Sequence, residues 1–407
     1  MRNPTTWPRL NLAAGPVQVM DQTLRDAGRP ILYHYDPAFI ELFARTSGLL
    51  QEVFRTSYDV VIMQGEAILG LEAAAAGLLS PGDKVLNLVS GVFGKWFEDF
   101  IRKYGGETIE LAVPYNDAID PEDVRKALQA NPGVKFLSVV HSETPSGTHN
   151  PVKEIGAVAR EFGVLTMVDT VSGLGAELLS PEEWGMDIAI AGPQKCLGGT
   201  PGLSLMTISP AAWEALEARK PEPLRASFLS ILDWKSAWLE GNRFPYTPSV
   251  SEMYSLESVL AQTLEVGMER FVDRQQTIAR ACREGVKALG LELWPAREEI
   301  AAACVTAVRV PAGVNDAELR GTMRHRYGVM ISPGYGELLG QLFRLGHMGP
   351  AQAHPTMLAA QLAVLERSLA DLGYPVQLGT GVGAAMSALA GWDDEGDGRD
   401  EGDGVVG

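Results

Sequence analysis

A lysine near the middle of the chain has the clearest potential for chemistry. Lys195 follows a short apolar run, Ile188 to Ala191, and stands in a glycine-rich turn, GPQKCLGG. Glycines permit positive φ and the close approach of a flat ligand. A partly desolvated lysine has a lowered pKa and forms a Schiff base with an aldehyde. A solvated lysine in a surface turn is the plainer alternative, but such a turn needs neither the buried strand nor the glycines.

An aspartate stands at the end of the preceding apolar segment. The run VLTMV, Val164 to Val168, is followed directly by Asp169. Open α/β sheets bind ligands at the carboxyl ends of their strands, so this acid and the lysine are expected at one edge. Pyridoxal chemistry needs a lysine for the aldehyde and a carboxylate that keeps the pyridine nitrogen protonated. Lys195 and Asp169 on consecutive strands therefore predict a pyridoxal-type site.

A third candidate is a glutamate where a phosphate would be expected. Asp59 to Met63 (DVVIM) predicts a strand, and the segment from Gly65 to Leu79 predicts a helix. The turn between such elements usually binds phosphate at the helix N-terminus, but here Glu66 occupies that position. A glutamate there commonly caps the helix or complements its dipole. If it instead faces the site, its charge repels a phosphate group.

Three further side chains are of types that could bind a flat aromatic ring and a carboxylate. Phe93, in SGVFGKW, can stack on a ring. Hydroxyls cluster in HSETPSGTHNP beyond the strand 134–140, among them Thr144. Arg344 lies inside the apolar run of GQLFRLGHMG, which is costly without an anionic partner. We expect it either to form a structural salt bridge or to bind a substrate carboxylate with its planar guanidinium.

The pattern of elements predicts how these residues are positioned. Strands and helices alternate over the first part of the chain, which predicts an α/β fold with a mostly parallel, doubly wound sheet. Beyond about residue 260, a long helix that a break could divide (255–290), a strand (304–310) and two further helices predict a smaller α+β domain. The expected division is an N-terminal arm at 1–25, a large cofactor- and substrate-binding domain at 26–260, a small C-terminal domain at 261–380 and a disordered acidic tail at 391–407.

Composition excludes several classes of function. The net charge of the 407 residues is −17, of which the last 17 residues contribute −6, so nucleic acid is an unexpected partner. No apolar run is long enough to cross a membrane and no signal peptide is evident, which predicts a cytoplasmic protein. The three cysteines and six histidines show no ligand spacing, so we expect no metal. Cys196, beside the lysine, is expected to be a small buried filler.

The order of motifs resembles a known family. AAGP, GLEAA, SGVFGKW, HSETPSGT, VDTVSG, AGPQKCLGG, FPYTPSV and RLGHMG are similar to motifs of the class V aminotransferases of the alanine–glyoxylate group, which have fold type I of the pyridoxal enzymes. The resemblance implies catalytic Lys195; a cofactor-binding set of Asp169, Phe93, Thr144, Glu66, Ala67, Ile68, Ser172 and Gln194; and substrate-binding Arg344, Tyr35, Tyr335 and Glu66. It also implies a homodimer or homotetramer, with Phe244, Tyr246 and Thr247 near a neighbouring subunit's site.

Within this group the motifs are similar to members that use free pyridoxamine as a substrate. The phosphate cup usually has small or hydroxyl residues where this chain has Glu66, Ala67 and Ile68. Phe244 replaces an aromatic hydroxyl that often reaches the phosphate, and Tyr335 stands where those members have an arginine.

The implied reaction moves the amino group of pyridoxamine to pyruvate, a 2-keto acid, and gives pyridoxal and L-alanine, a step of vitamin B6 degradation. Pyridoxal would rest as a Schiff base on Lys195. The alternative is an aminotransferase that holds pyridoxal 5′-phosphate and acts on alanine, serine or ureidoglycine with glyoxylate. An NAD-dependent oxidoreductase lacks support because no GxGxxG motif is present.

Overall fold

A central seven-stranded sheet forms the body of the protein. The computed structural model describes residues 8–220 and 222–392. Along the sheet the strand order is β2-β10-β9-β8-β5-β3-β4. The bounds are β2 (Asp59–Gln64), β10 (Leu203–Ile208), β9 (Ile188–Ala191), β8 (Leu165–Asp169), β5 (Val134–Val140), β3 (Lys84–Val89) and β4 (Glu107–Ala112). Only β10 runs antiparallel to its neighbours in this sheet, so the predicted mostly parallel sheet is confirmed.

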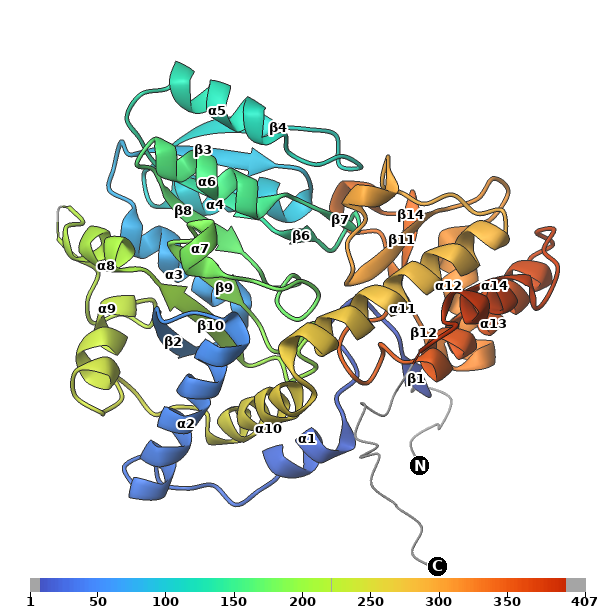
Figure 1. The fold of residues 1–407 in the computed structure, drawn as a ribbon, viewed down its shortest axis with the longest axis horizontal. Coiled ribbons are helices and arrows are strands. Elements are labelled where there is room, and N and C mark those ends of the chain that lie inside the picture. The colour runs from blue at the N-terminus through green and yellow to red at the C-terminus, as the bar shows by residue number, and fades with distance from the viewer. Residues whose placement is uncertain (1–7, 221, 393–407) are drawn as a thin grey trace, which may run out of the picture.

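Helices cover both faces of this sheet (Figure 1). The helices that follow the sheet strands are α3 (Ala67–Leu78), α4 (Val92–Lys103), α5 (Pro121–Ala130), α6 (Val152–Glu161) and α8 (Pro210–Glu217). Short elements lie between them: β6 (Ser142–Glu143), β7 (Thr148–His149), α7 (Pro181–Trp184) and α9 (Ile231–Trp234). Parallel strands that are joined through helices give the doubly wound arrangement, which positions the carboxyl ends of β8 and β9 side by side.

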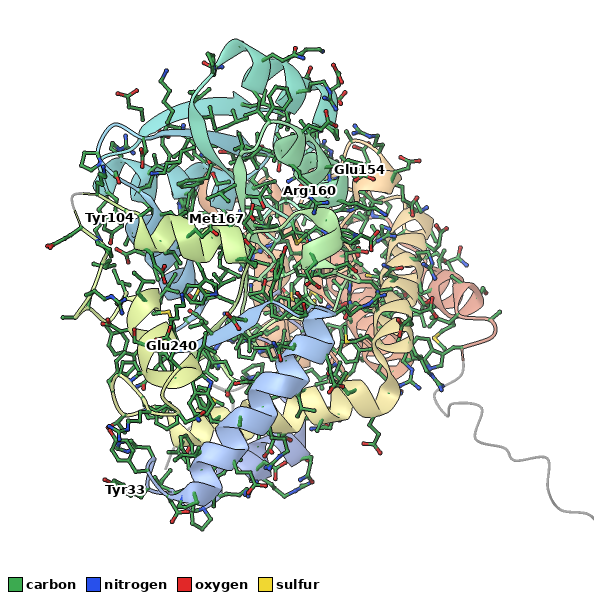
Figure 2. All side chains as sticks on the ribbon, turned by 60° about the vertical axis from the view of Figure 1, so that its left-hand side comes forward. Tyr33, Tyr104, Glu154, Arg160, Met167 and Glu240 are labelled. Atoms are coloured by element: carbon green, nitrogen blue, oxygen red, sulfur yellow. The ribbon has the colours of Figure 1, made fainter. Side chains whose placement is uncertain are left out.

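The strands are buried because both faces of the sheet are covered. Met167, in β8, is 1% exposed, whereas Tyr33 in the N-terminal region is 65% exposed. Figure 2 shows Met167 within the body of the molecule and Tyr33 at its periphery. Fully covered parallel strands read as continuous apolar runs, which is why the sequence pattern located most of them.

The C-terminal part contains a second, smaller sheet with its own hydrophobic cluster. Strands β11 (Val305–Arg309), β14 (Leu342–Gly346) and β13 (Ser332–Pro333) pair antiparallel in that order. The helices are α11 (Met268–Ala288), α12 (Asp316–Tyr327), α13 (Pro355–Asp371) and α14 (Thr380–Ala388), which Figure 1 shows beside the large sheet. Their apolar faces form a cluster around Phe343 and Leu362. The domain boundaries predicted above stay predictions, and residues 393–407 of the predicted tail lie outside the described residues.

The predicted long helix is two helices. α10 (Val250–Val266) and α11 are separated by Gly267, whose φ is 85°. A positive φ interrupts the helical path and is adopted most readily by glycine. The break lets α10 pack on α2 (Pro37–Phe54), while α11 continues into the C-terminal part.

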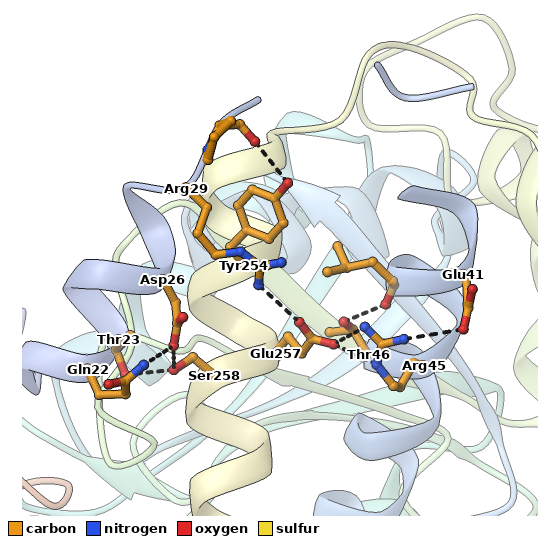
Figure 3. A network of polar contacts seen from close by, with 12 residues as sticks. Gln22, Thr23, Asp26, Arg29, Glu41, Arg45, Thr46, Tyr254, Glu257 and Ser258 are labelled. Atoms are coloured by element: carbon orange, nitrogen blue, oxygen red, sulfur yellow. Dashed lines mark hydrogen bonds and ion pairs between the residues drawn. The ribbon is translucent and has the colours of Figure 1, made fainter. Parts of the chain in front are cut away.

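The N-terminal segment is fastened to both parts of the protein. β1 (Leu10–Asn11) pairs parallel with β12 (Val329–Met330), and α1 (Asp21–Ala27) packs on α10. Figure 3 shows the polar contacts of α1, α2 and α10. The Ser258 hydroxyl donates to Asp26 over 2.7 Å, and Glu257 forms ion pairs with Arg29 at 3.9 Å and Arg45 at 2.5 Å. These contacts anchor both ends of the intervening residues 12–20, which pack against the turn that bears Lys195.

The helices within residues 8–220 and 222–392 are each too short or too polar to span a lipid bilayer. No group of three or more histidine, cysteine, aspartate or glutamate side chains there is arranged to hold a metal ion.

Candidate active site

Lys195 stands at the sheet edge, in the turn that follows β9. The turn packs closely against the N-terminal segment, since a Cβ added to Gly15 would lie 2.6 Å from Lys195 Nζ. That amine donates a hydrogen bond to the carbonyl of Ala14 over 3.2 Å. Burial lowers the pKa of Lys195, and the nearby charge of Arg344 adds to this effect. A lysine with a lowered pKa is available as a neutral, nucleophilic amine.

Asp169 ends β8, the neighbouring strand, where it pairs in register with Ile190 of β9. Its side chain is 7% exposed, and one oxygen accepts a hydrogen bond from Val171 N over 2.9 Å. Burial raises the pKa of Asp169 to about 6, against the lowering effects of that hydrogen bond and of Lys195. Among the described residues no cation forms a salt bridge with it. A buried carboxylate in this state favours a cationic ligand group.

Lys195 and Asp169 border one cavity of about 160 Å³. Its polar wall includes Glu66, Ser142 and Ser172, and its apolar wall includes Phe93 and Trp96 from α4. Ala67 and Ile68 complete the set of predicted residues that line it. A larger cavity, of about 500 Å³, lies between α10 and α11 and contains none of the predicted site residues. The smaller cavity is therefore the candidate active site, because it joins the reactive groups.

Glu66 both caps α3 and faces this cavity. One carboxylate oxygen accepts from Ile68 N over 3.1 Å, and the other accepts from Gln194 Nε2 over 2.7 Å. Gln194 is 2% exposed, and its amide oxygen has no hydrogen-bond partner among the described residues. Glu66, held by Gln194, thus presents acceptor oxygens at the place where a phosphate site would present donors.

Arg344 lies on β14 and is 8% exposed. Its Nε donates to the carbonyl of Pro333 over 2.7 Å, and Nη1 donates to the carbonyl of Thr144 over 3.1 Å. Burial lowers the pKa of this guanidinium to about 10. No carboxylate among the described residues pairs with Arg344. A buried guanidinium that is oriented by carbonyls alone favours an anionic ligand over the structural salt bridge considered above.

Comparison with known proteins identifies the family. The family described as Aminotransferase class-V matches residues 24–338. The chain is 45% identical to the pyridoxamine–pyruvate transaminase of Mesorhizobium japonicum over 382 residues, 94% of this chain and 97% of that protein. The crystal structure of pyridoxamine–pyruvate aminotransferase from Mesorhizobium loti is similar, with TM-score 0.92 and 44% identity over 96% of this chain and 100% of that one. This chain is a class V aminotransferase.

A ureidoglycine–glyoxylate aminotransferase from Bacillus subtilis is also similar in structure, with TM-score 0.88 and 28% identity over 93% of this chain and 97% of that one. Membership implies a pyridoxal-type group, an amine and a 2-keto acid. The residues of this aminotransferase fit that group: Lys195 supplies an amine, and the unpaired carboxylate of Asp169 would hold a protonated ring nitrogen. Phe93 offers a flat apolar surface in the same cavity.

The hydroxyls of Thr144 and Ser172 lie close together in this aminotransferase. Their oxygens are 2.5 Å apart, and both belong to segments that follow strand ends, β5 and β8. Thr144 also accepts a hydrogen bond from Arg344 through its carbonyl. It therefore connects Ser172, which lines the cavity, to the arginine.

Tyr335 lies at the cavity mouth. Its ring centroid is 5.4 Å from that of Trp96 and 6.1 Å from that of Phe93, and 40% of the side chain is exposed. Trp96 had no predicted role. Its signal was its spacing from Phe93, because residues i and i+3 share one side of a helix, but the sequence pattern did not predict α4.

Eight predicted residues do not line this cavity. Gln194, Thr144 and Tyr335 contact residues that do line it, and Arg344 bonds Thr144.

The other four lie elsewhere. Tyr35 packs on His34 at the surface, and Thr247 lines a separate surface hollow. The hydroxyl of Tyr246 accepts from Trp234 Nε1 over 3.0 Å. Phe244 is 6% exposed and stacks on Trp238 in the core of its own chain. The predicted role of Tyr35 in substrate binding, and those of Phe244, Tyr246 and Thr247 in a neighbouring subunit's site, remain predictions.

Of two further buried residues, Cys196 was assigned a role from the sequence and Glu143 was not. Cys196 is fully buried, and burial raises its pKa well above the usual range, which fits the predicted filler. Glu143 was not singled out, although it is also fully buried and contacts the start of α4. Glu143 lies within the HSETPSGT motif, in which a role was predicted only for the hydroxyl side chains.

Proposed function

We propose that this aminotransferase moves the amino group of free pyridoxamine to pyruvate and gives pyridoxal and L-alanine. The observation that carries the proposal is Glu66, a carboxylate at the N-terminus of α3 that lines the cavity and is fixed by Gln194. The similarity to pyridoxamine–pyruvate aminotransferase, in sequence and in structure, supports the same choice of substrate.

Charge at Glu66 distinguishes free pyridoxamine from its phosphate. A unit charge pair about 4 Å apart is repelled by roughly 4 kcal/mol at an effective dielectric near 20. The attraction of an anion to a helix N-terminus offsets only about 0.3–1 kcal/mol of this repulsion. The 5′-hydroxyl of free pyridoxamine can instead donate to Glu66, which lines the cavity. The same carboxylate therefore disfavours phosphate and favours a hydroxyl.

Each remaining residue has a proposed part in the reaction. Lys195, as a neutral amine, removes a proton from C4′ of pyridoxamine joined to the keto acid and returns one to the future α-carbon of alanine. Asp169 keeps the ring nitrogen protonated, and Arg344 binds the carboxylate of pyruvate. Phe93 stacks on the ring, and Thr144 donates a hydrogen bond at its side. When bound, the pyridine ring supplies an electron sink.

Rates with the two amines test the proposal. The purified protein should hold no stoichiometric pyridoxal phosphate by absorbance and mass analysis, and kcat/KM for pyridoxamine should far exceed that for pyridoxamine phosphate. Glu66→Ser should narrow this preference by improving the phosphorylated substrate and impairing the free one. Glu72→Ala is the matched control, because Glu72 lies on the same helix and bonds Tyr104 over 2.8 Å instead of lining the cavity.

The opposite result would favour the alternative enzyme. If the protein is isolated with stoichiometric pyridoxal phosphate and exchanges alanine with glyoxylate, the glyoxylate aminotransferase reading replaces the proposal.

Assembly into a homodimer or homotetramer is also a proposal. It is supported by the exposed aromatic side chains Tyr33, Tyr35 and Phe228, which are 65%, 47% and 48% exposed in the single chain, since apolar surface of this kind marks interfaces. Light scattering of the purified protein gives the mass directly, and a monomer would contradict it.

A further inference from the structure

We infer that Glu143 is a positioning residue that holds Phe93 and the start of α4 against the cavity. The inference rests on the proposed function, in which Phe93 stacks on the pyridine ring. Glu143 itself is absent from the residues that line the cavity, so it would act through α4 and not by touching the ligand.

Glu143 supplies the cap that α4 lacks in its own sequence. The residue before α4 is Gly91, which has no side chain to accept a hydrogen bond. Instead Glu143, on β6, accepts from Phe93 N over 3.2 Å and from Gly94 N over 2.7 Å, one bond to each carboxylate oxygen. The first backbone N–H groups of a helix have no partner within the helix. A residue about fifty positions away in the chain therefore fixes the first turn.

The surroundings fit the carboxylate closely. A Cβ on Gly91 would lie 2.5 Å from Glu143 Oε2, and a Cβ on Gly94 would lie 3.3 Å from Oε1. The φ of Gly91 is −175°, an extended conformation that any residue can adopt. Gly91 is thus needed for the space it leaves to the carboxylate and not for its backbone freedom.

The Glu143 carboxylate is more deeply buried than a helix cap needs to be. Asp120 caps α5 from an exposed position and accepts from Glu122 N over 2.8 Å. Glu143 is 0% exposed, and burial raises its pKa to about 7 although both N–H donors lower it. Burying a carboxylate in this way is costly unless it is well bonded.

What burial adds is a rigid connection to the rest of the site. The carbonyl of Glu143 accepts from Ser146 N over 3.2 Å and Gly147 N over 2.8 Å, which fixes its backbone in a tight turn. The next residue, Thr144, contacts Ser172 through its hydroxyl and Arg344 through its carbonyl. Residues 143 and 144 therefore connect the Phe93 wall, the segment after Asp169 and the carboxylate-binding arginine. Catalytic side chains need such support to stay within small distances of their working positions.

Glu143→Gln tests the inference, because one acceptor oxygen becomes an NH₂ group that faces a backbone donor. We expect the dissociation constant of pyridoxal, measured by visible absorbance titration, to rise about tenfold. The visible circular dichroism of bound pyridoxal should weaken as the stacked ring loses its fixed orientation. KM for pyridoxamine should rise with that constant, whereas KM for pyruvate should change less than about twofold. Glu98→Gln is the matched control, since Glu98 lies on α4 and pairs with Lys95 at 2.8 Å.

A double-mutant cycle separates positioning from general stability. If Glu143 acts through Phe93, Glu143→Gln should have almost no further effect on pyridoxal binding in a Phe93→Leu background. Additive effects, or a lower melting temperature with unchanged pyridoxal affinity, would overturn the inference. If Glu143→Gln does not fold, Gly91→Ala tests the same contact from the other side, and unchanged affinity there would also overturn it. Failure of the proposed function can be distinguished from failure of this inference. If the protein holds pyridoxal phosphate, the same double-mutant cycle can be measured with pyridoxal phosphate.

Discussion

The cavity has two sides that are assembled in different ways. Lys195 and Asp169 stand at the ends of adjacent strands, where sheet hydrogen bonds fix their relation. The other side is assembled from separate segments: Glu66 begins α3 and Trp96 lies on α4, while Tyr335 and Arg344 of the C-terminal part are connected to it through Trp96 and Thr144. Under the proposed roles, proton transfer depends on the rigid sheet edge, while the choice of substrate depends on tertiary contacts. Substitutions on the two sides should therefore impair different properties of the enzyme.

The largest effect is expected at Lys195. Lys195→Ala removes the amine that moves the proton, so kcat should fall by at least about 10³-fold, with the fold intact by circular dichroism. Borohydride treatment of the wild-type protein with pyridoxal, followed by peptide mapping, should place the label on Lys195. A label on another lysine would contradict the assignment.

A change at Asp169 should slow the reaction and also alter the dependence of stability on pH. Asp169→Asn should lower kcat by about 10²-fold or more and leave KM for pyruvate nearly unchanged. Burial raises the pKa of Asp169 to about 6 from an ordinary 3.8. The folded protein therefore binds this proton more tightly than the unfolded chain. The resulting stabilisation is present below pH 3.8 and is lost as the pH rises through 6, by about 3 kcal/mol in total.

Urea unfolding of the ligand-free proteins from pH 4 to pH 7.5 measures this effect. The free energy of unfolding of Asp169→Asn should gain on that of the wild type as the pH rises, because the variant has no carboxyl to ionise. Asp99→Asn, an exposed position on α4, should run parallel to the wild type. Parallel curves for Asp169→Asn as well would show that Asp169 titrates normally.

Sequence patterns predicted the sheet-edge side of the cavity well and the other side poorly. β2 and β5 begin at the residues where the sequence pattern placed them, Asp59 and Val134, since buried parallel strands have a local signature. The helix α4 was missed because SGVFGKW carries two glycines and no local cap; its cap is Glu143, distant in the chain. The pattern allowed a break in the long helix but did not place it at Gly267, because a glycine inside a helical pattern is often tolerated. Contacts between distant segments leave no periodic pattern, so Trp96 and Glu143 required the structure.

Arg344 tests the side that tertiary contacts assemble. Arg344→Lys keeps the charge but loses the planar group that the carbonyls of Pro333 and Thr144 orient. KM for pyruvate should rise about tenfold, while KM for pyridoxamine should stay within about twofold. Arg309→Lys is the control, because Arg309 lies on the neighbouring strand β11 and packs over Trp294. An unchanged KM for pyruvate would mean that Arg344 only supports the backbone.

The smallest effect is expected at Tyr335, where the choice of keto acid can be changed. The tyrosine packs on Trp96, which lines the cavity, and stands two residues after Pro333, whose carbonyl accepts from Arg344. Tyr335→Arg adds a second cation there. Because the position is 40% exposed, solvent screens the gain to about 0.2–1 kcal/mol, which is a factor of about 1.4 to 5. The ratio of kcat/KM for oxaloacetate to that for pyruvate should rise by this factor at low salt and less at high salt. Tyr335→Phe, which keeps the ring, should leave the ratio unchanged. If Tyr335→Arg leaves it unchanged at low salt too, Arg344 alone sets acceptor choice, and the aromatic mouth has no part in it.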